Sequence, residues 1–337
     1  MNFRDTICAR TQTPAAKDYQ TITEFAENGA AMKVTFLRQP EPGKQTLAFE
    51  MASFYDEGEH DICISTLAGC SRICTFCSVP AYRGFDAYLT PQEIALQIDY
   101  AIKIRNPDHA LPNIVGMMGN GEPFGNMKLS EEERPYIFAA IERIASLPID
   151  RMTISTVGDK PDVLQKFVAF SQTLHTPFPI KLQFSLQTPF DAERKMLVPT
   201  AKPLAQTMNV LDEYTAVSGH PVKYNIVLLS ARNGNYTNAT AVHARAVSRL
   251  LQTASLYDGM PVPRILKLSI YNPFPGSPFM PVSQASTQDY IKILHEHGVT
   301  AIKTFKGSGI EIDTHAHTGG FSCGQLAVTT RQSCSLD

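Results

Sequence analysis

Short apolar runs alternate along this chain with longer segments in which apolar and polar residues recur at helical spacing. The short runs are apolar nearly throughout, which is typical of strands buried on both faces. We expect strands at residues 62–66, 113–119, 152–156, 180–186, 222–229, 265–271 and 300–305.

The segments between these runs carry apolar residues three and four positions apart, as on one face of a helix. The expected helices cover residues 91–104, 131–145, 160–174, 203–217 and 287–298. Repeated strand–helix units predict a parallel sheet that closes, or partly closes, into a barrel. In such a barrel the chemistry takes place at the carboxyl ends of the strands.

The start of the chain follows a different pattern. Its first thirty residues are polar and weakly patterned, whereas residues 32–38 and 45–52 are expected to form two strands joined by a turn at Glu41-Pro42-Gly43. The simplest division is an N-terminal extension with this hairpin at residues 1–55, followed by one barrel domain at residues 56–337.

Charge limits the ways in which the chain can bind a partner. The 337 residues carry a formal net charge of −2, whereas proteins that hold nucleic acid by bulk charge are usually more basic. An RNA partner would therefore have to meet a local patch. No apolar run has the length of a membrane span, and no secretion signal opens the chain, so we expect a cytoplasmic protein without a membrane partner.

The cysteines indicate metal or redox chemistry. There are seven of them, an odd number, and four lie within the segment 63–77, which does not fit a secreted disulfide framework. Cys70, Cys74 and Cys77 have the spacing C-x-x-x-C-x-x-C, directly after the first expected barrel strand. Three thiolates at this spacing can hold a [4Fe–4S] cluster and leave one iron open to chelate S-adenosylmethionine (SAM). The alternative is a zinc site, which usually needs a fourth protein ligand.

With these cysteines, the chain resembles the RlmN/Cfr family of radical SAM RNA methyltransferases, from about Lys33 to Ala327. The resemblance implies a partial (β/α)6 barrel, a [4Fe–4S] cluster at Cys70, Cys74 and Cys77, and SAM as a second cofactor. The motifs that carry it are Gly119-Asn120-Gly121-Glu122-Pro123, Ser155-Thr156-Val157-Gly158, Ser185-Leu186-Gln187, Asn272-Pro273-Phe274-Pro275-Gly276 and Cys323-Gly324-Gln325-Leu326.

The same resemblance implies roles for individual residues. Cys323 would carry the transferred methyl group, Cys63 would attack the Cys323 sulfur to release the product, and Glu50 would accept the substrate proton. The implied SAM-binding residues are Gly121, Glu122, Ser155, Ser185, Leu186, Gln187 and Asn272. An alternative interpretation makes Cys63 a small buried core residue and Glu50 a solvated strand residue.

Several positions depart from the family pattern. Gln187 stands where the family has histidine, and Asn120 stands where it has methionine. The segment that contains His315 and His317 resembles an insertion; two such histidines are more often exposed polar residues than a metal pair. The helical RNA-binding region that precedes the barrel in the family is largely absent, because only about thirty residues come before the strand pair.

These features lead to one principal hypothesis and two alternatives. The principal one is methylation of C2 or C8 of an adenine in ribosomal or transfer RNA, with electrons from a flavodoxin- or ferredoxin-type reductant. The first alternative keeps this mechanism but acts on a small nucleotide, a natural product or a peptide. The second is a non-catalytic, zinc-stabilised RNA-binding protein.

Overall fold

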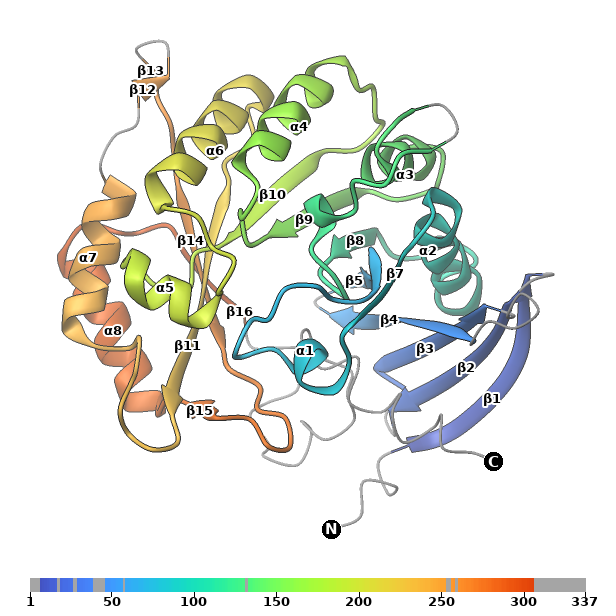
Figure 1. The fold of residues 1–337 in the computed structure, drawn as a ribbon, viewed down its shortest axis with the longest axis horizontal. Helices are drawn as coiled ribbons and strands as arrows, with labels where there is room; N and C mark the ends of the chain where they lie inside the picture. Colours follow the sequence, from blue (N-terminus) through green and yellow to red (C-terminus); the bar gives the residue numbers. More distant parts are fainter. Residues whose placement is uncertain are drawn as a thin grey trace.

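One large curved sheet organises the computed structural model, and helices cover its outer face (Figure 1). The structure describes residues 7–16, 19–26, 29–38, 46–56, 58–130, 133–252, 256–257 and 260–305. Cys323, His315 and His317 therefore lie outside the described residues. No helix in the described part is long and apolar enough to cross a bilayer.

The sheet has an antiparallel part and a parallel part. The antiparallel strands are β1 (Ile7–Ala16), β2 (Tyr19–Ala26), β3 (Ala31–Arg38) and β4 (Leu47–Asp56). The parallel strands are β5 (Glu59–Ile64), β8 (Asn113–Met117), β9 (Arg151–Thr156), β10 (Ile180–Ser185), β11 (Lys223–Ala231), β14 (Ile265–Ile270) and β16 (Ile302–Phe305). Antiparallel pairing of β4 with β5 joins the two parts into one sheet.

In the described part of the chain, six helices connect the parallel strands on the outside. They are α2 (Pro91–Arg105), α3 (Tyr136–Ile144), α4 (Pro161–Thr173), α6 (Leu204–Ser218), α7 (Ala241–Gln252) and α8 (Gln284–Glu296). The short helices α1 (Ser78–Tyr82) and α5 (Asp191–Leu197) lie at the carboxyl ends of the strands, as does a 3₁₀ turn, η2 (Pro123–Gly125). Small strand pairs form from β6 (Leu67–Gly69) with β7 (Phe85–Tyr88) and from β12 (Leu256–Tyr257) with β13 (Met260–Pro261), while β15 (Phe279–Pro281) pairs with β11.

The expected α/β fold is confirmed, with all seven barrel strands pairing in parallel. Among the described residues the barrel is open: β1 ends the sheet on one side and β16 on the other. The hairpin of β3 and β4 is also confirmed. The division at residue 55 stays a prediction, since the sheet runs without a break from β4 into β5.

The chain forms more strands at its start than a single hairpin. β1 and β2 lie in the first thirty residues, where the sequence is polar. In β2, the buried hydroxyls of Thr21 and Thr23 each lie 3.1 Å from the hydroxyl of Tyr100 on α2. Polar side chains are tolerated inside a strand when they are hydrogen-bonded in this way, and hydrophobic periodicity does not reveal such strands.

The expectation that the barrel strands are apolar on both faces is wrong. On β10, Ile180, Leu182 and Phe184 belong to the main core beneath the helices, whereas Lys181 and Gln183 alternate with them and lie on the inner face. β11 and β14 follow the same alternation. An open barrel needs an apolar outer face for its helices, but its concave inner face is free to carry polar side chains.

Candidate functional site

The three cluster cysteines lie in one loop at the carboxyl end of β5. This loop begins after β6 and ends at α1, so Cys70, Cys74 and Cys77 occupy the expected end of the barrel. Backbone hydrogen bonds hold it in place: the Cys70 amide donates to the Gly84 carbonyl at 3.2 Å, and the Thr75 amide donates to the Leu197 carbonyl at 3.0 Å.

Gly69 is a requirement of this loop that the sequence pattern did not reveal. Its φ of 72° is a left-handed conformation, and a Cβ at this position would lie 1.8 Å from the Gly84 carbonyl oxygen. The same carbonyl accepts the hydrogen bond from Cys70. The close approach of the two backbone segments therefore fixes the start of the cysteine loop and excludes any side chain at residue 69.

The thiols of this loop fit an iron–sulfur cluster. Burial raises the pKa of Cys70 and raises that of Cys74 well above its ordinary value, with the charges of the other cysteines adding to the effect for Cys74. Such thiols ionise when a cation such as iron lies beside them. Among the described residues, no three His, Cys, Asp or Glu side chains converge as ligands of a single metal ion. The absence of such a single-ion site is compatible with a [4Fe–4S] cluster, because the three cysteines that hold a cluster bind three different irons.

Glu122 follows β8 and is buried beside the next strand end. Its carboxylate accepts hydrogen bonds from Thr156 Oγ1 at 2.5 Å and from the Val157 amide at 2.8 Å. Burial, with the nearby charge of Asp159, raises its pKa to about 7. Gly121 has a φ of 100°, and a Cβ there would lie 2.6 Å from Leu67. A carboxylate held in this way is suited to pair with an ammonium group.

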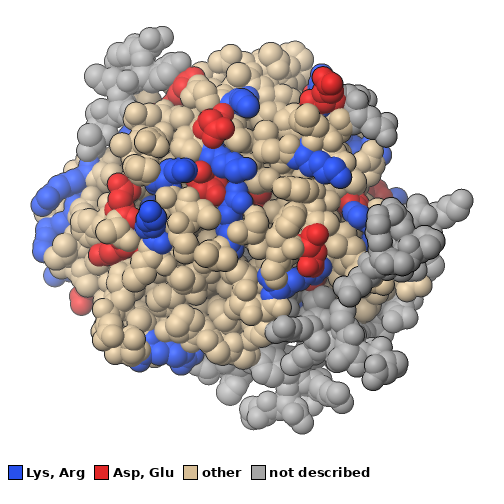
Figure 2. Space-filling model, viewed as in Figure 1, with Lys and Arg blue, Asp and Glu red and all other residues tan. Residues whose placement is uncertain are grey.

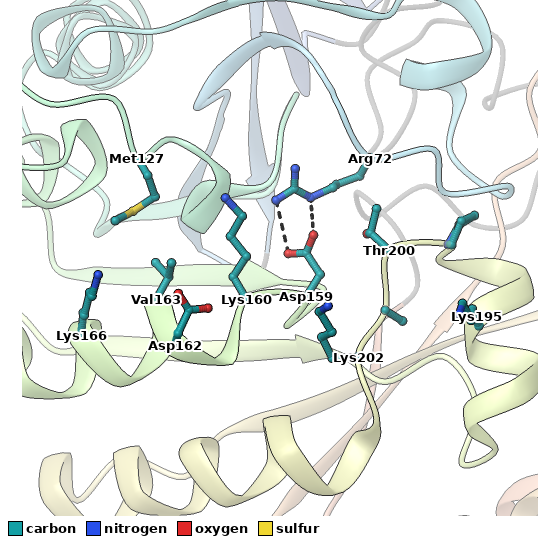
Figure 3. Close-up of a pocket in the computed structure, with 12 residues that line it drawn as sticks. Arg72, Met127, Asp159, Lys160, Asp162, Val163, Lys166, Lys195, Thr200 and Lys202 are labelled. Atoms are coloured by element: carbon teal, nitrogen blue, oxygen red, sulfur yellow. Dashed lines mark hydrogen bonds and ion pairs between the residues drawn. The ribbon is translucent and has the colours of Figure 1, made fainter.

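An ion pair that the sequence did not predict adjoins the cluster loop. Arg72, between Cys70 and Cys74, binds Asp159 through both sides of its guanidinium, with Nε 2.5 Å from Oδ2 and Nη2 3.4 Å from Oδ1 (Figure 3). Asp159 follows β9, so the pair connects the cluster loop to the end of a second barrel strand. Its only sequence signal is the position of Arg72 within the cysteine motif.

Ser185 is the last residue of β10, and Leu186 and Gln187 directly follow it in a segment that Arg194 holds in place. This buried guanidinium donates to the carbonyls of Ser185 at 3.3 Å and Leu186 at 3.2 Å, and also to that of Val157. Gln187 has a φ of 63°, and its side-chain oxygen accepts from the Val227 amide at 2.9 Å. The Gln187 side-chain amide therefore connects the end of β10 to β11. At this position, where the family has histidine, glutamine has a structural role.

Ser155 and Asn272 belong to two parts of the sheet that β10 and β11 separate. Ser155, on β9, accepts a hydrogen bond from Gln183 Nε2 at 3.3 Å, and Lys267 Nζ in turn donates to Gln183 Oε1 at 3.1 Å. Asn272 begins the segment after β14. This segment meets α1, where the Tyr82 hydroxyl donates to the Pro275 carbonyl at 2.7 Å. The Asn272 segment is thus held against the helix that follows Cys77.

Glu50 is fully buried, so the interpretation as a solvated residue is wrong. Its Oε1 forms an ion pair with Arg83 Nη1 at 3.0 Å, and its Oε2 accepts a hydrogen bond from Asn120 Nδ2. Lys33, also fully buried, lies on the adjacent strand β3, and burial lowers its pKa against the opposing effect of the Glu50 and Glu24 charges. Arg83 and Asn120 are partners that sequence spacing did not identify.

Cys63 lies on β5, the strand that leads toward the cluster loop. It packs with Ala31, Ala52 and Phe54, a group separate from the main core to which Ile62 and Ile64 belong. Since successive strand residues point to opposite faces, Cys63 lies on the inner face. Its neighbour on β8 is Gly116, which has no side chain.

Comparisons with known proteins agree with this arrangement. A model of the radical SAM superfamily matches residues 64–241, just over half of the chain. The chain is 29% identical over 318 residues to the ribosomal RNA large subunit methyltransferase Cfr of Clostridium botulinum (strain Langeland), covering 90% of this chain and 83% of that protein. It is 26% identical over 326 residues to the probable dual-specificity RNA methyltransferase RlmN of Thermus thermophilus, covering 95% and 80%.

A solved structure shares the fold. The radical SAM methyltransferase from Sphaerobacter thermophilus superposes with a TM-score of 0.70 at 23% identity, covering 94% of this chain and 80% of that one. The superfamily match includes the cysteine loop, Glu122 and the strand ends around them. The chain therefore belongs to the radical SAM superfamily, whose cofactors are a [4Fe–4S] cluster and SAM.

Proposed function

We propose that this protein is a radical SAM RNA methyltransferase that transfers a methyl group, by way of S-methylated Cys323, to C2 or C8 of an adenine in ribosomal or transfer RNA. The relatives Cfr and RlmN, named as RNA methyltransferases, support the reaction class and the substrate class. The observation that carries the mechanism is the inner-face position of Cys63 on the strand that leads into the cluster loop. Membership of the superfamily weighs against the zinc-stabilised RNA-binding protein.

In this proposal, each of the site residues has a chemical task. The cluster and SAM, held by Cys70, Cys74 and Cys77 and by Glu122 with its neighbours, supply the methyl group and the radical that activates it. Cys323 carries the methyl group as a thioether and becomes bonded through it to the adenine carbon. The radical adduct would give up one electron, for which the oxidised cluster would be the acceptor, and Glu50 accepts the proton that this carbon loses.

Cys63 then completes the cycle. Its thiolate attacks the Cys323 sulfur and forms a Cys63–Cys323 disulfide, while the bond from that sulfur to the methylene carbon breaks. The methylene carbon takes the electron pair of the broken bond and a proton from the protonated Glu50, which completes the methyl group. The methylated adenine leaves, and two electrons from an external reductant, of the flavodoxin or ferredoxin type, return both cysteines to thiols. The position of Cys63 on the inner face, on the strand that leads into the cluster loop, supports its assignment as the nucleophile that meets a second sulfur.

A Cys63→Ala variant tests this proposal. It is expected to methylate Cys323 and to form 5′-deoxyadenosine, but then to stay covalently bonded to its substrate, because no second thiol is present to cleave the thioether. Purification from the native host under denaturing conditions, then nuclease digestion and mass spectrometry, identifies the bound molecule. Cys334→Ala is the matched control, since that cysteine has no assigned task.

The outcome separates the candidate substrates. An adenosine adduct supports the RNA methyltransferase. An adduct with a peptide or small molecule supports the same mechanism on a different substrate. Normal turnover by Cys63→Ala, checked with SAM that carries a CD₃ group and mass spectrometry of RNA nucleosides, contradicts the two-cysteine mechanism.

A further inference from the structure

A basic groove of about 740 Å³ lies beside the cluster loop, outside the barrel interior (Figure 3). It is formed by the cluster loop, the segment after η2, the start of α4, the end of α5 and the segment that precedes α6. Gly121, Glu122, Ser155, Ser185, Leu186, Gln187 and Asn272, the residues proposed to bind SAM, do not line it. The groove is therefore a feature separate from the site described above.

The groove carries an excess of positive charge. Five cationic side chains and two carboxylates line it, and one of the carboxylates, Asp159, is already paired with Arg72. The cations are Arg72, Lys160, Lys166, Lys195 and Lys202. Among the residues that the structure describes, none of these four lysines forms an ion pair, and all but the half-exposed Lys160 are exposed. This local excess of three positive charges contrasts with a net charge of −2 for the whole chain.

The position of the lysines favours an extended polyanion over a single small anion. They come from α4, from α5 and from the segment before α6, and Figure 3 shows them spread around the Arg72–Asp159 pair rather than converging on one point. Spaced cations of this kind are the donors that contact successive phosphates.

The groove also lies where contact with the sugar–phosphate backbone of an RNA would serve catalysis. Arg72 belongs to the loop between two cluster cysteines, and Figure 2 shows Lys and Arg side chains gathered around the middle of the face that carries this loop. An RNA strand held here would have its phosphates beside the carboxyl ends of the barrel strands. A weakly acidic protein that acts on RNA needs such a local patch, because its overall charge repels the substrate.

We infer that this groove binds the sugar–phosphate backbone of the RNA that flanks the target nucleotide. The inference rests on the proposed function, and it adds the surface through which the enzyme would bind its RNA substrate. Lys166 and Lys202 lie on different segments of the rim and are the best residues to test, since both are exposed and neither belongs to the cluster or SAM machinery.

The test compares two double variants of the cluster-loaded enzyme. The first is Lys166→Gln with Lys202→Gln. The second, the control, is Lys103→Gln with Lys292→Gln, which removes the same charge from α2 and α8, where each lysine has only an exposed carboxylate partner. Binding of a fluorescein-labelled RNA hairpin with an adenine-containing loop is measured by anisotropy between about 50 and 200 mM salt.

Each lost phosphate contact is expected to weaken binding about five- to eightfold at 0.1 M salt, so the groove variant should lose roughly 25- to 60-fold. Its slope of log Kd against log salt should fall by about 1.4 to 1.8, whereas the control should keep the wild-type slope. Formation of 5′-deoxyadenosine without RNA should be equal in all three proteins, which shows that the cluster and the fold are intact.

Two results would overturn the inference, and only the second would also overturn the proposed function. If the wild type binds the hairpin and the groove variant binds it equally well, the groove is not the RNA surface, and the proposed function stands. If the wild type binds sodium polyglutamate but not RNA, and the groove variant loses that binding, the groove takes an acidic peptide and the RNA methyltransferase is overturned as well.

Discussion

Asn120 occupies a position where the family motif has methionine, and its amide is hydrogen-bonded to Glu50. Together with Arg83 it holds both carboxylate oxygens of a side chain that is fully shielded from water. A buried carboxylate needs such partners, because an isolated charge is costly in a protein interior. The substitution of methionine by asparagine therefore has a local physical reason, which is the orientation of the proposed proton acceptor.

This reason predicts a kinetic effect of Asn120→Ala. The variant loses one of the two groups that orient the Glu50 carboxylate, and because a reacting group displaced by about 1 Å can lose about 100-fold in rate, proton removal from the adenine should slow by roughly 10- to 100-fold. Methylation of an RNA substrate deuterated at the target carbon should then show a larger kinetic isotope effect than the wild type. An unchanged isotope effect, with intact 5′-deoxyadenosine formation, would remove Glu50 from the proton step.

Asp61 provides a second prediction at the residue scale. Burial, followed by the charges of Glu59 and Asp56, raises its pKa to about 6 from an ordinary value near 3.8. At a pH between these two pKa values, Asp61 is protonated in the folded protein and ionised in the unfolded chain. The free energy of unfolding therefore falls as the pH rises from about 4 to 6. Asp61→Asn should remove this loss. Its melting temperature should exceed that of the wild type at pH 7.5 and converge with it near pH 4; a pH-independent difference would contradict the assignment.

At the scale of elements, the short β6–β7 pair determines where the cysteine loop begins. Gly69 ends β6 and pairs with Phe85, and Gly84 directly precedes β7, but the surroundings of the two glycines differ. A Cβ on Gly69 would collide with backbone, whereas a Cβ on Gly84 would meet nothing within 4 Å. The two glycines thus form a matched pair for testing the element without changing its charge or polarity.

Gly69→Ala is expected to displace the loop and lower both stability and iron content. A left-handed conformation alone makes alanine unfavourable, by more than about 1 kcal/mol, and the backbone collision adds to this cost. Gly84→Ala should keep a full cluster. Iron and sulfide analysis of anaerobically prepared proteins, with thermal unfolding, provides the measurement; equal iron content in the two variants would show that the strand pair does not set the loop.

At the scale of the whole molecule, the N-terminal strands and the barrel share one hydrophobic core. Val34, Phe36 and Phe49 from the antiparallel part pack in the same cluster as the barrel strands and α2. Arg38 on β3 also forms an ion pair with the buried Glu93 of α2. Cooperative unfolding follows from such shared burial, because neither part can keep its apolar face covered alone.

Scanning calorimetry should therefore record a single unfolding transition for the cluster-free protein. The transition is expected to move as one peak when Arg38→Ala removes the contact with Glu93, because the weakened contact lies inside the cooperative unit. Two resolved transitions in the wild type would instead show that the N-terminal strands and the barrel unfold as separate domains.

Hydrophobic periodicity by itself determined the positions of the parallel strands and of most of the longer helices, since burial against a common sheet imposes a regular pattern on each segment. It missed α7 and the polar strands β1 and β2, and in β2 the buried hydroxyls are satisfied by a distant partner, Tyr100. The cluster cysteines were identifiable for a related reason: the three ligands lie within one loop, so their spacing alone carries the chemistry.

The tertiary structure decided everything that depends on residues distant in sequence. The partners of Glu50 come from the C-terminal end of α1 and from the loop after β8, and the Arg72–Asp159 pair joins two strand ends. The basic groove is assembled from five segments, none of which is a charge run on its own. Spacing along a chain records local geometry, whereas burial and electrostatic partnership arise only when the fold brings separate elements together.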